Sequence, residues 1–173
     1  LAQQGNHALL AQGCRQLLES WFDQCAYPDG PNWTSSLEHG IRLVNWAVAW
    51  HLLGGESAAL FESTQGAAFR QRWLASIRQH CHFIAGWLSR YSSANNHLLG
   101  ETMGLYVAAI TWPMWPQSAQ WRALAGESDR SVRRRLLRPR MASGSTRSSR
   151  RTTVRHWTWR EISCGSAAWA ATT

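Results

Sequence analysis

The chain has 173 residues and a formal net charge of +8, from 18 Arg, no Lys and 10 acidic residues. It begins at Leu1 with no charged segment and apolar run of the kind that marks a secretion signal, so we expect it to be a piece of a longer protein. The longest apolar stretch, 43–53, contains polar residues and is far shorter than the roughly 20 residues of a membrane span, which excludes a membrane-spanning segment.

The positive charge is concentrated at the C-terminal end. Residues 1–125 hold 7 Arg and 7 acidic residues, whereas residues 126–173 hold 11 Arg and 3 acidic residues. A basic surface would suggest nucleic acid or an acidic polymer as a partner, but here that suggestion concerns only the last quarter of the chain.

Two helices are predicted in the first third of the chain. Apolar residues recur at helical spacing over 8–22, and the turn-forming residues of 27–31 end that pattern. Ser35 and Glu38 have the spacing of a capping box, which predicts a second helix that stops at Gly54.

Three further helices are predicted after that. A third covers 67–91 with an apolar face that includes Trp73 and Trp87, a fourth begins near Asn96 and stops before Pro113, and a short fifth covers 117–125. No segment alternates with the period of a strand, so we predict an all-α domain of antiparallel helical hairpins over residues 1–125. In residues 126–173 the helical period is lost and Arg and Ser dominate, which predicts a disordered basic tail.

Cysteine and histidine spacing gives no metal site. The four cysteines are widely separated and are expected to be small core residues, with one in the tail, rather than a disulfide framework: Cys14, Cys25, Cys81 and Cys164. His80 and His82 would point about 200° apart on a helix and could not share one ion. No metal or cofactor is therefore expected.

Three segments resemble, in order, the N-terminal helical domain of the heparinase II/III-like lyases, a group that includes alginate lyases. They are 32–46, the amphipathic segment 73–88, and 95–105, which contains Asn95-Asn96-His97 followed by Leu-Leu-Gly-Glu. The resemblance implies an incomplete α/α toroid, followed in the family by a β-sandwich domain. It also implies a periplasmic or secreted enzyme that cleaves a uronic-acid polysaccharide, alginate or a glycosaminoglycan-like polymer, with neither membrane nor nucleic acid as its partner.

The family's reaction is β-elimination, in which a base removes the C5 proton of the uronate and the oxygen on C4 leaves. That proton is very weakly acidic, so the site must stabilise an enolate-like dianion with hydrogen-bond donors. The resemblance makes Asn96 the residue that neutralises the carboxylate, at a helix start where unpaired backbone N–H groups also favour an anion. It makes His97 the residue that takes or relays the proton, a role suited to imidazole near neutral pH.

Four other residues have both a structural and a functional interpretation. Asn95 could shape the loop before the site, or Asn95 and Asn96 could only cap the following helix. Glu38 and Arg42 have the spacing of a helix-surface ion pair, while the resemblance suggests that they line the substrate groove. Trp46, like Trp33 and Trp50, could stack on a sugar ring or belong to the core.

The family's catalytic Tyr has no counterpart in the tail, because residues 126–173 contain no Tyr. Read one nucleotide out of register, 140–153 can encode Asp-Gly followed by Glu-Gln-Ser-x-x-Tyr, the pattern that carries that Tyr in the family. We therefore hypothesise a frameshifted tail, and we expect this chain by itself to be an inactive lyase fragment. The alternative is a non-catalytic helical module whose basic tail binds acidic polymer or nucleic acid.

Overall fold

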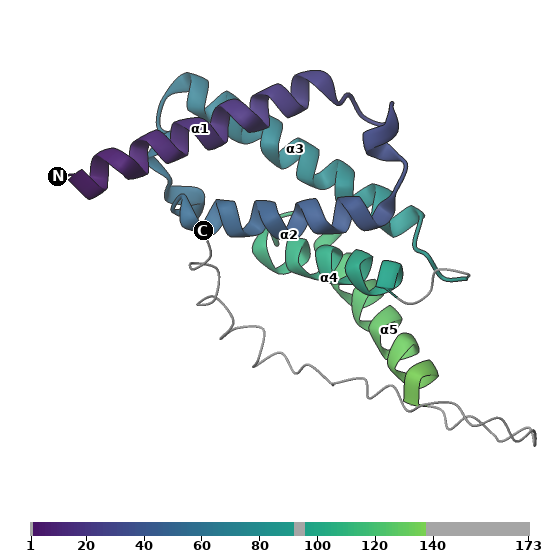
Figure 1. Cartoon of the computed structure of the whole chain (residues 1–173). Helices are drawn as coiled ribbons and strands as arrows, with labels where there is room; N and C mark the ends of the chain where they lie inside the picture. The colour runs from purple at the N-terminus through teal and green to yellow at the C-terminus, as the bar shows by residue number, and fades with distance from the viewer. Residues whose placement is uncertain (1, 92–95, 138–173) are drawn as a thin grey trace, which may run out of the picture. The chain divides into compact units, whose positions relative to one another are not determined.

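The computed structural model describes residues 2–91 and 96–137, and in these stretches the chain is helical with no strand (Figure 1). The five α-helices are α1 (Ala2–Gln24), α2 (Ser36–Leu52), α3 (Thr64–Gly86), α4 (Asn96–Thr111) and α5 (Ser118–Leu137). Short 3₁₀ turns lie in the connections, at Pro31–Trp33, Gly55–Ser57 and Ala59–Phe61. The prediction of an all-α fold is confirmed. The tail from 138 onward, with Cys164 and the frameshift hypothesis, lies outside the described residues.

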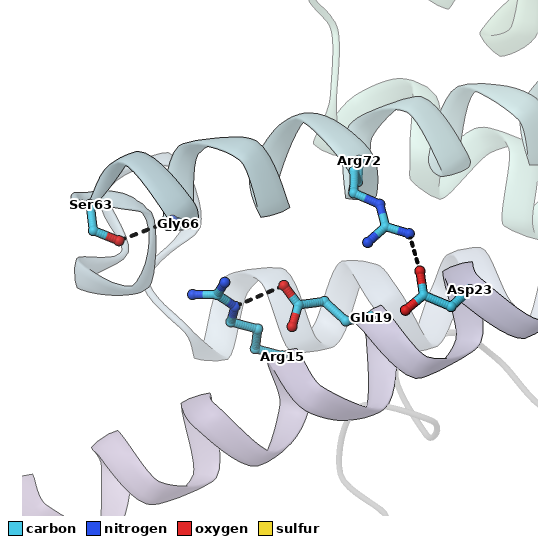
Figure 2. Close-up of polar contacts among 6 residues, drawn as sticks. All are labelled: Arg15, Glu19, Asp23, Ser63, Gly66 and Arg72. Atoms are coloured by element: carbon cyan, nitrogen blue, oxygen red, sulfur yellow. Dashed lines mark hydrogen bonds and ion pairs between the residues drawn. The ribbon is translucent and has the colours of Figure 1, made fainter.

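The capping box predicted at the start of α2 does not form. Ser35 is the N-cap residue, but its side chain caps no backbone N–H, and Glu38 is exposed. The Ser35 carbonyl oxygen instead accepts hydrogen bonds from the backbone N–H and ring Nδ1 of His39. At the start of α3 a cap does form, because Ser63 Oγ accepts from the backbone N–H of Gly66 at 3.0 Å (Figure 2).

Two helix ends differ from the sequence-based expectation. Helix α3 stops at Gly86 rather than near Tyr91, since Trp87 adopts φ −130° and ψ 45°, outside the helical region. Helix α5 continues through Gly126 to Leu137, beyond the predicted end at 125. One interior Gly costs only about 1 kcal/mol, which burial of Ala125 and its neighbours in α5 can offset.

Helices α2 and α4 form the most extensive contact between elements, and they lie side by side in Figure 1. Their backbones touch at glycines: a Cβ on Gly40 would lie 2.5 Å from the Gly100 carbonyl oxygen, and a Cβ on Gly104 would collide with the Gly40 backbone. Later in α2, Trp50 approaches Trp112, just after α4, at 5.8 Å between ring centroids. Because later residues of α2 meet later residues of α4, the two helices run in the same direction.

Helix α1 is joined to α3 by a thinner layer of contacts. Figure 2 shows Asp23 of α1 accepting from Arg72 of α3 at 2.5 Å, and the pair of Arg15 with Glu19 within α1 at 3.0 Å. The Arg72–Asp23 pair is exposed, and such pairs contribute about 0–1 kcal/mol, so the apolar contacts between α1 and α3 matter more. Leu18 of α1 is buried in the core.

The core is rich in aromatic side chains and runs through α2, α3 and α4. The largest fully buried apolar side chains are Leu43, Phe69, Trp73, Ile77, Ile84, Leu105 and Trp112. Parts of the predicted apolar faces are exposed, among them Leu10, Leu17, Ile41, Val48, Leu52, Trp87 and Ile110.

Cys81 is buried, Cys14 and Cys25 are half-buried, and all three are free thiols. No helix in residues 2–91 and 96–137 is both long and apolar enough to cross a membrane.

The glycine crossing gives a direct stability test. Ala normally stabilises a helix interior by about 1 kcal/mol relative to Gly. In Gly40→Ala the added methyl would meet backbone atoms that cannot rotate away, and we expect the free energy of unfolding to fall by about 1–3 kcal/mol. The matched control is Gly13→Ala in α1, where nothing lies within 4 Å and stability should stay the same or rise. Urea denaturation followed by circular dichroism measures the stability of both variants. A Gly40→Ala midpoint equal to that of the wild type would contradict the close contact.

Candidate active site

Asn96 and His97 are the first two residues of α4, as predicted, and both side chains are exposed. The first backbone N–H groups of a helix have no intrahelical partner and point out of its start. An amide, an imidazole and free backbone donors therefore occur together at one exposed helix end. Asn95 lies outside the described residues.

The start of α4 is tied to the residues that follow α3. Leu98 is buried against Leu88. The Glu101 carboxylate accepts from the backbone N–H of Ser89 at 2.8 Å and from Ser89 Oγ at 2.6 Å. These contacts fix the first turn of α4, and with it the position of His97, one turn before Glu101.

Glu101 is a positioning residue that the sequence analysis did not single out. Its side chain is 0% exposed, and both of its carboxylate oxygens accept hydrogen bonds from Ser89. The available signal was that Glu101 is the one charged residue in the mostly apolar run from 98 to 110. Burial of a polar group is costly unless hydrogen bonds such as these satisfy it.

The start of α2 lies beside the start of α4. Ser36 Oγ donates to the carbonyl oxygen of Trp87 at 2.7 Å, and a Cβ on Gly100 would meet the Leu37 side chain. Glu38, in the first turn of α2, is exposed at this same end. The structure thus gathers the starts of both helices, with residues 87–89 between them, into what we call the helix-start site.

Arg42 and Trp46 lie elsewhere. Arg42 donates to the Asn32 carbonyl oxygen at 2.9 Å and approaches His80 Nε2 at 3.3 Å, and among the ion pairs of the described residues none joins it to Glu38. Trp46 is 8% exposed and packs into the core. The two side chains face α1 and α3, whereas Gly40 marks the face of α2 that meets α4. Their assignment to the substrate groove stays a prediction.

The chain was compared with known proteins. The family model described as "Heparinase II/III N-terminus" matches residues 10–131, which is most of the chain and nearly all of its described part. The chain belongs to the heparinase II/III family. The match extends past Gly126 and agrees with the continuation of α5 there. No curated protein gives a significant match. No solved structure gives one either.

Beside the helix-start site, this heparinase II/III-family domain buries two histidines in an aromatic cluster. The His39 ring stacks on Phe83 at 4.4 Å, and Trp33 lies 4.5 Å from His80 between ring centroids. The His80 Nδ1–H donates to the Ser76 carbonyl oxygen at 2.7 Å, which leaves Nε2 as the acceptor that faces Arg42.

Burial lowers the pKa of both histidines. The pKa of His80 is lowered to about 3, mainly by desolvation and to a lesser extent by the nearby His39 and Arg42. Desolvation also lowers the pKa of His39. By contrast His82, two residues from His80, is exposed and meets the ring of Trp121 edge-on. Within the described part of the chain no three His, Cys, Asp or Glu side chains gather as a metal site would require.

An apolar hollow of about 440 Å³ lies at the opposite end of α2. It is lined by His7, Ala8, Ala11, Leu53, Ala59 and Leu60. A uronate needs donors and cations, which this lining hardly offers. The hollow is therefore not part of the helix-start site.

The buried histidines predict that the domain loses stability in acid. The pKa of His80 is lower when folded than when unfolded, so its contribution is complete above about pH 6.5 and is lost as the pH falls toward about 3. At about pH 5 the expected loss from His80 is about 2 kcal/mol. In His80→Gln the difference in unfolding free energy between neutral pH and pH 5 should shrink by about that amount, measured by urea denaturation. His82→Gln is the matched control, and an unchanged pH dependence in His80→Gln would refute this assignment.

Proposed function

We propose that this domain supplies Asn96 and His97 to a polysaccharide lyase that cleaves a uronic-acid polymer, alginate or a glycosaminoglycan-like chain, by β-elimination. Membership of the heparinase II/III family supports a polysaccharide lyase lineage. The observation that carries the proposal is the exposure of Asn96 and His97 together at the start of α4.

The proposed reaction begins at the carboxylate of the uronate. The Asn96 side-chain NH₂ donates to a carboxylate oxygen, and the unpaired backbone N–H groups of the first turn support the same charge. This stabilisation lowers the cost of removing the C5 proton. An amide suits the role because it donates without competing for the proton.

His97 takes or relays the C5 proton. The electron pair of the C5–H bond forms the C4=C5 double bond, the bond from C4 to the glycosidic oxygen breaks, and that oxygen receives a proton from an acid. By analogy with the family, the acid is a Tyr from a downstream segment. The products are an unsaturated uronate and a new chain end.

The arrangement of helices supports a toroid as the scaffold. Helices α2 and α4 run in the same direction, with α3 antiparallel between them in the chain, as successive hairpins of a ring would. Glu38 is exposed in the first turn of α2, and we propose that it contacts a sugar bound at the helix starts. We also propose that Asn95, next to Asn96 in the chain, and Arg42 belong to the substrate groove, and that the intact enzyme is periplasmic or secreted.

The test replaces Asn96 in the intact enzyme that carries this domain. Asn96→Ala should reduce kcat by about 100-fold or more, because a donor aimed at developing charge is lost. Asn96→Asp should reduce it further, because it sets a negative charge against the carboxylate. The measurement is the ultraviolet absorbance of the unsaturated product. Gln71→Ala, an exposed amide on α3, is the matched control. Full activity of Asn96→Ala, or no activity of the intact enzyme on any uronate polymer, would overturn the proposal.

The many Arg residues at the C-terminal end support one alternative function, in which a basic tail binds acidic polymer or nucleic acid. Because α5 ends at Leu137, the deletion should begin at 138 so that the helix stays whole. If the lyase proposal holds, residues 1–137 keep their affinity for an alginate hexasaccharide in calorimetry. If the alternative holds, binding disappears with the tail and depends steeply on salt beforehand.

A further inference from the structure

Trp87 exposes its indole although its backbone is firmly held. The backbone N–H donates to the carbonyl oxygens of Phe83 and Ile84 at 3.0 and 3.2 Å, and the carbonyl oxygen accepts from Ser36 Oγ at 2.7 Å. The side chain is nonetheless 71% exposed. Exposed indoles are costly in a free protein and are enriched where a ligand covers them.

Trp87 itself is held at the helix-start site by its backbone carbonyl oxygen, which accepts from Ser36 Oγ. Its neighbour Leu88 packs against Leu98, and Ser89 binds Glu101, so residues 87–89 run alongside the first turn of α4. Trp87 is nine residues from Asn96 in the chain but is joined to the same end of the fold by these contacts.

Arg90 lies three residues after Trp87 in the chain and carries a positive charge. Arg90 is exposed, its backbone N–H donates to the Leu88 carbonyl oxygen at 2.9 Å, and no ion pair among the described residues includes its guanidinium. A guanidinium matches a carboxylate with two parallel hydrogen bonds. The segment thus presents one flat apolar face and one cation within four residues.

We infer that Trp87 and Arg90 form a sugar subsite next to the catalytic one. The indole stacks on the C–H face of a pyranose ring, and the Arg90 guanidinium binds the carboxylate of that uronate or of the next. This inference rests on the proposed function, because it takes the uronic-acid polymer as the occupant. A uronate combines an apolar ring face with a carboxylate, which is the combination that Trp87 and Arg90 offer.

The subsite and the catalytic residues would bind different sugars of the same polymer. Asn96 and His97 act on the reacting uronate, while Trp87 and Arg90 hold a neighbouring one. Binding by remote sugars fixes the register of the reacting residue without taking part in bond breaking. Loss of Trp87 should therefore affect binding of long oligosaccharides more than that of a disaccharide.

The test is calorimetric binding of saturated alginate and heparan hexasaccharides to the full chain. Trp87→Ala should weaken binding about fivefold, and Trp87→Phe, which keeps an aromatic face, should recover most of it. Arg90→Gln should weaken binding by a similar factor at low salt and by less at high salt. Because the indole is exposed, Trp87→Ala should melt at the temperature of the wild type. Leu52→Ala is the matched control, since Leu52 is 72% exposed at the other end of α2.

The outcomes separate this inference from the proposed function. Tight binding by the wild type with equal affinity in Trp87→Ala overturns the subsite and leaves the lyase proposal standing. Weakened binding in Trp87→Ala, with no lyase activity in the intact enzyme, supports the subsite and overturns the lyase. If the wild type binds neither hexasaccharide, the subsite is overturned, while the lyase proposal still depends on the activity of the intact enzyme.

Discussion

The contact on which the rest of the domain depends is the approach of α2 to α4 at Gly40 and Gly104. A side chain at either position would collide with the opposite backbone. With no side chain between them, the two helices come close enough for Leu37 to reach Gly100 and for the core residues beyond the crossing to interdigitate. A helix interior normally disfavours Gly, so this contact must return more free energy than the two glycines cost.

The crossing also fixes where the candidate chemistry lies. It brings the start of α2 beside the start of α4, and the segment after α3 is then bound to both, through Ser36 on one side and Glu101 on the other. The residues that carry the proposed reaction are thus placed by backbone contact and by two buried hydrogen-bonding side chains. None of the described side-chain contacts that form this framework involves Asn96 or His97.

Much of the fold could be predicted from the sequence because it depends on local patterns. Apolar spacing gave the five helices, and Asn96 as the start of the fourth helix was predicted correctly. The pattern could not say which apolar residues are exposed, since Leu17 and Trp87 fit the period as well as buried residues do. That distinction depends on how many neighbours each helix has, which periodicity does not encode.

The site was predicted less completely, for a related reason. Asn96 and His97 could be picked out by their resemblance to a family motif, whereas Glu101 and Ser89 matter only because two segments meet in space. The spacing of Ser35 and Glu38 permits a capping box but does not fix their rotamers, and in the structure the Ser35 side chain caps no backbone N–H. The end of α5 was predicted at 125, because the amino-acid composition changes at Gly126. In the structure the helix continues past that position to Leu137.

The shared direction of α2 and α4 has an electrostatic consequence. Each helix carries a macrodipole equivalent to roughly half a positive charge at its start, and two parallel helices place both positive ends at one site. That field comes from the peptide backbone, so no substitution at Asn96, His97 or Arg90 removes it, and it acts before any side-chain contact is made. It would favour an acidic polymer over a neutral one on first encounter, and the side chains would then determine its register.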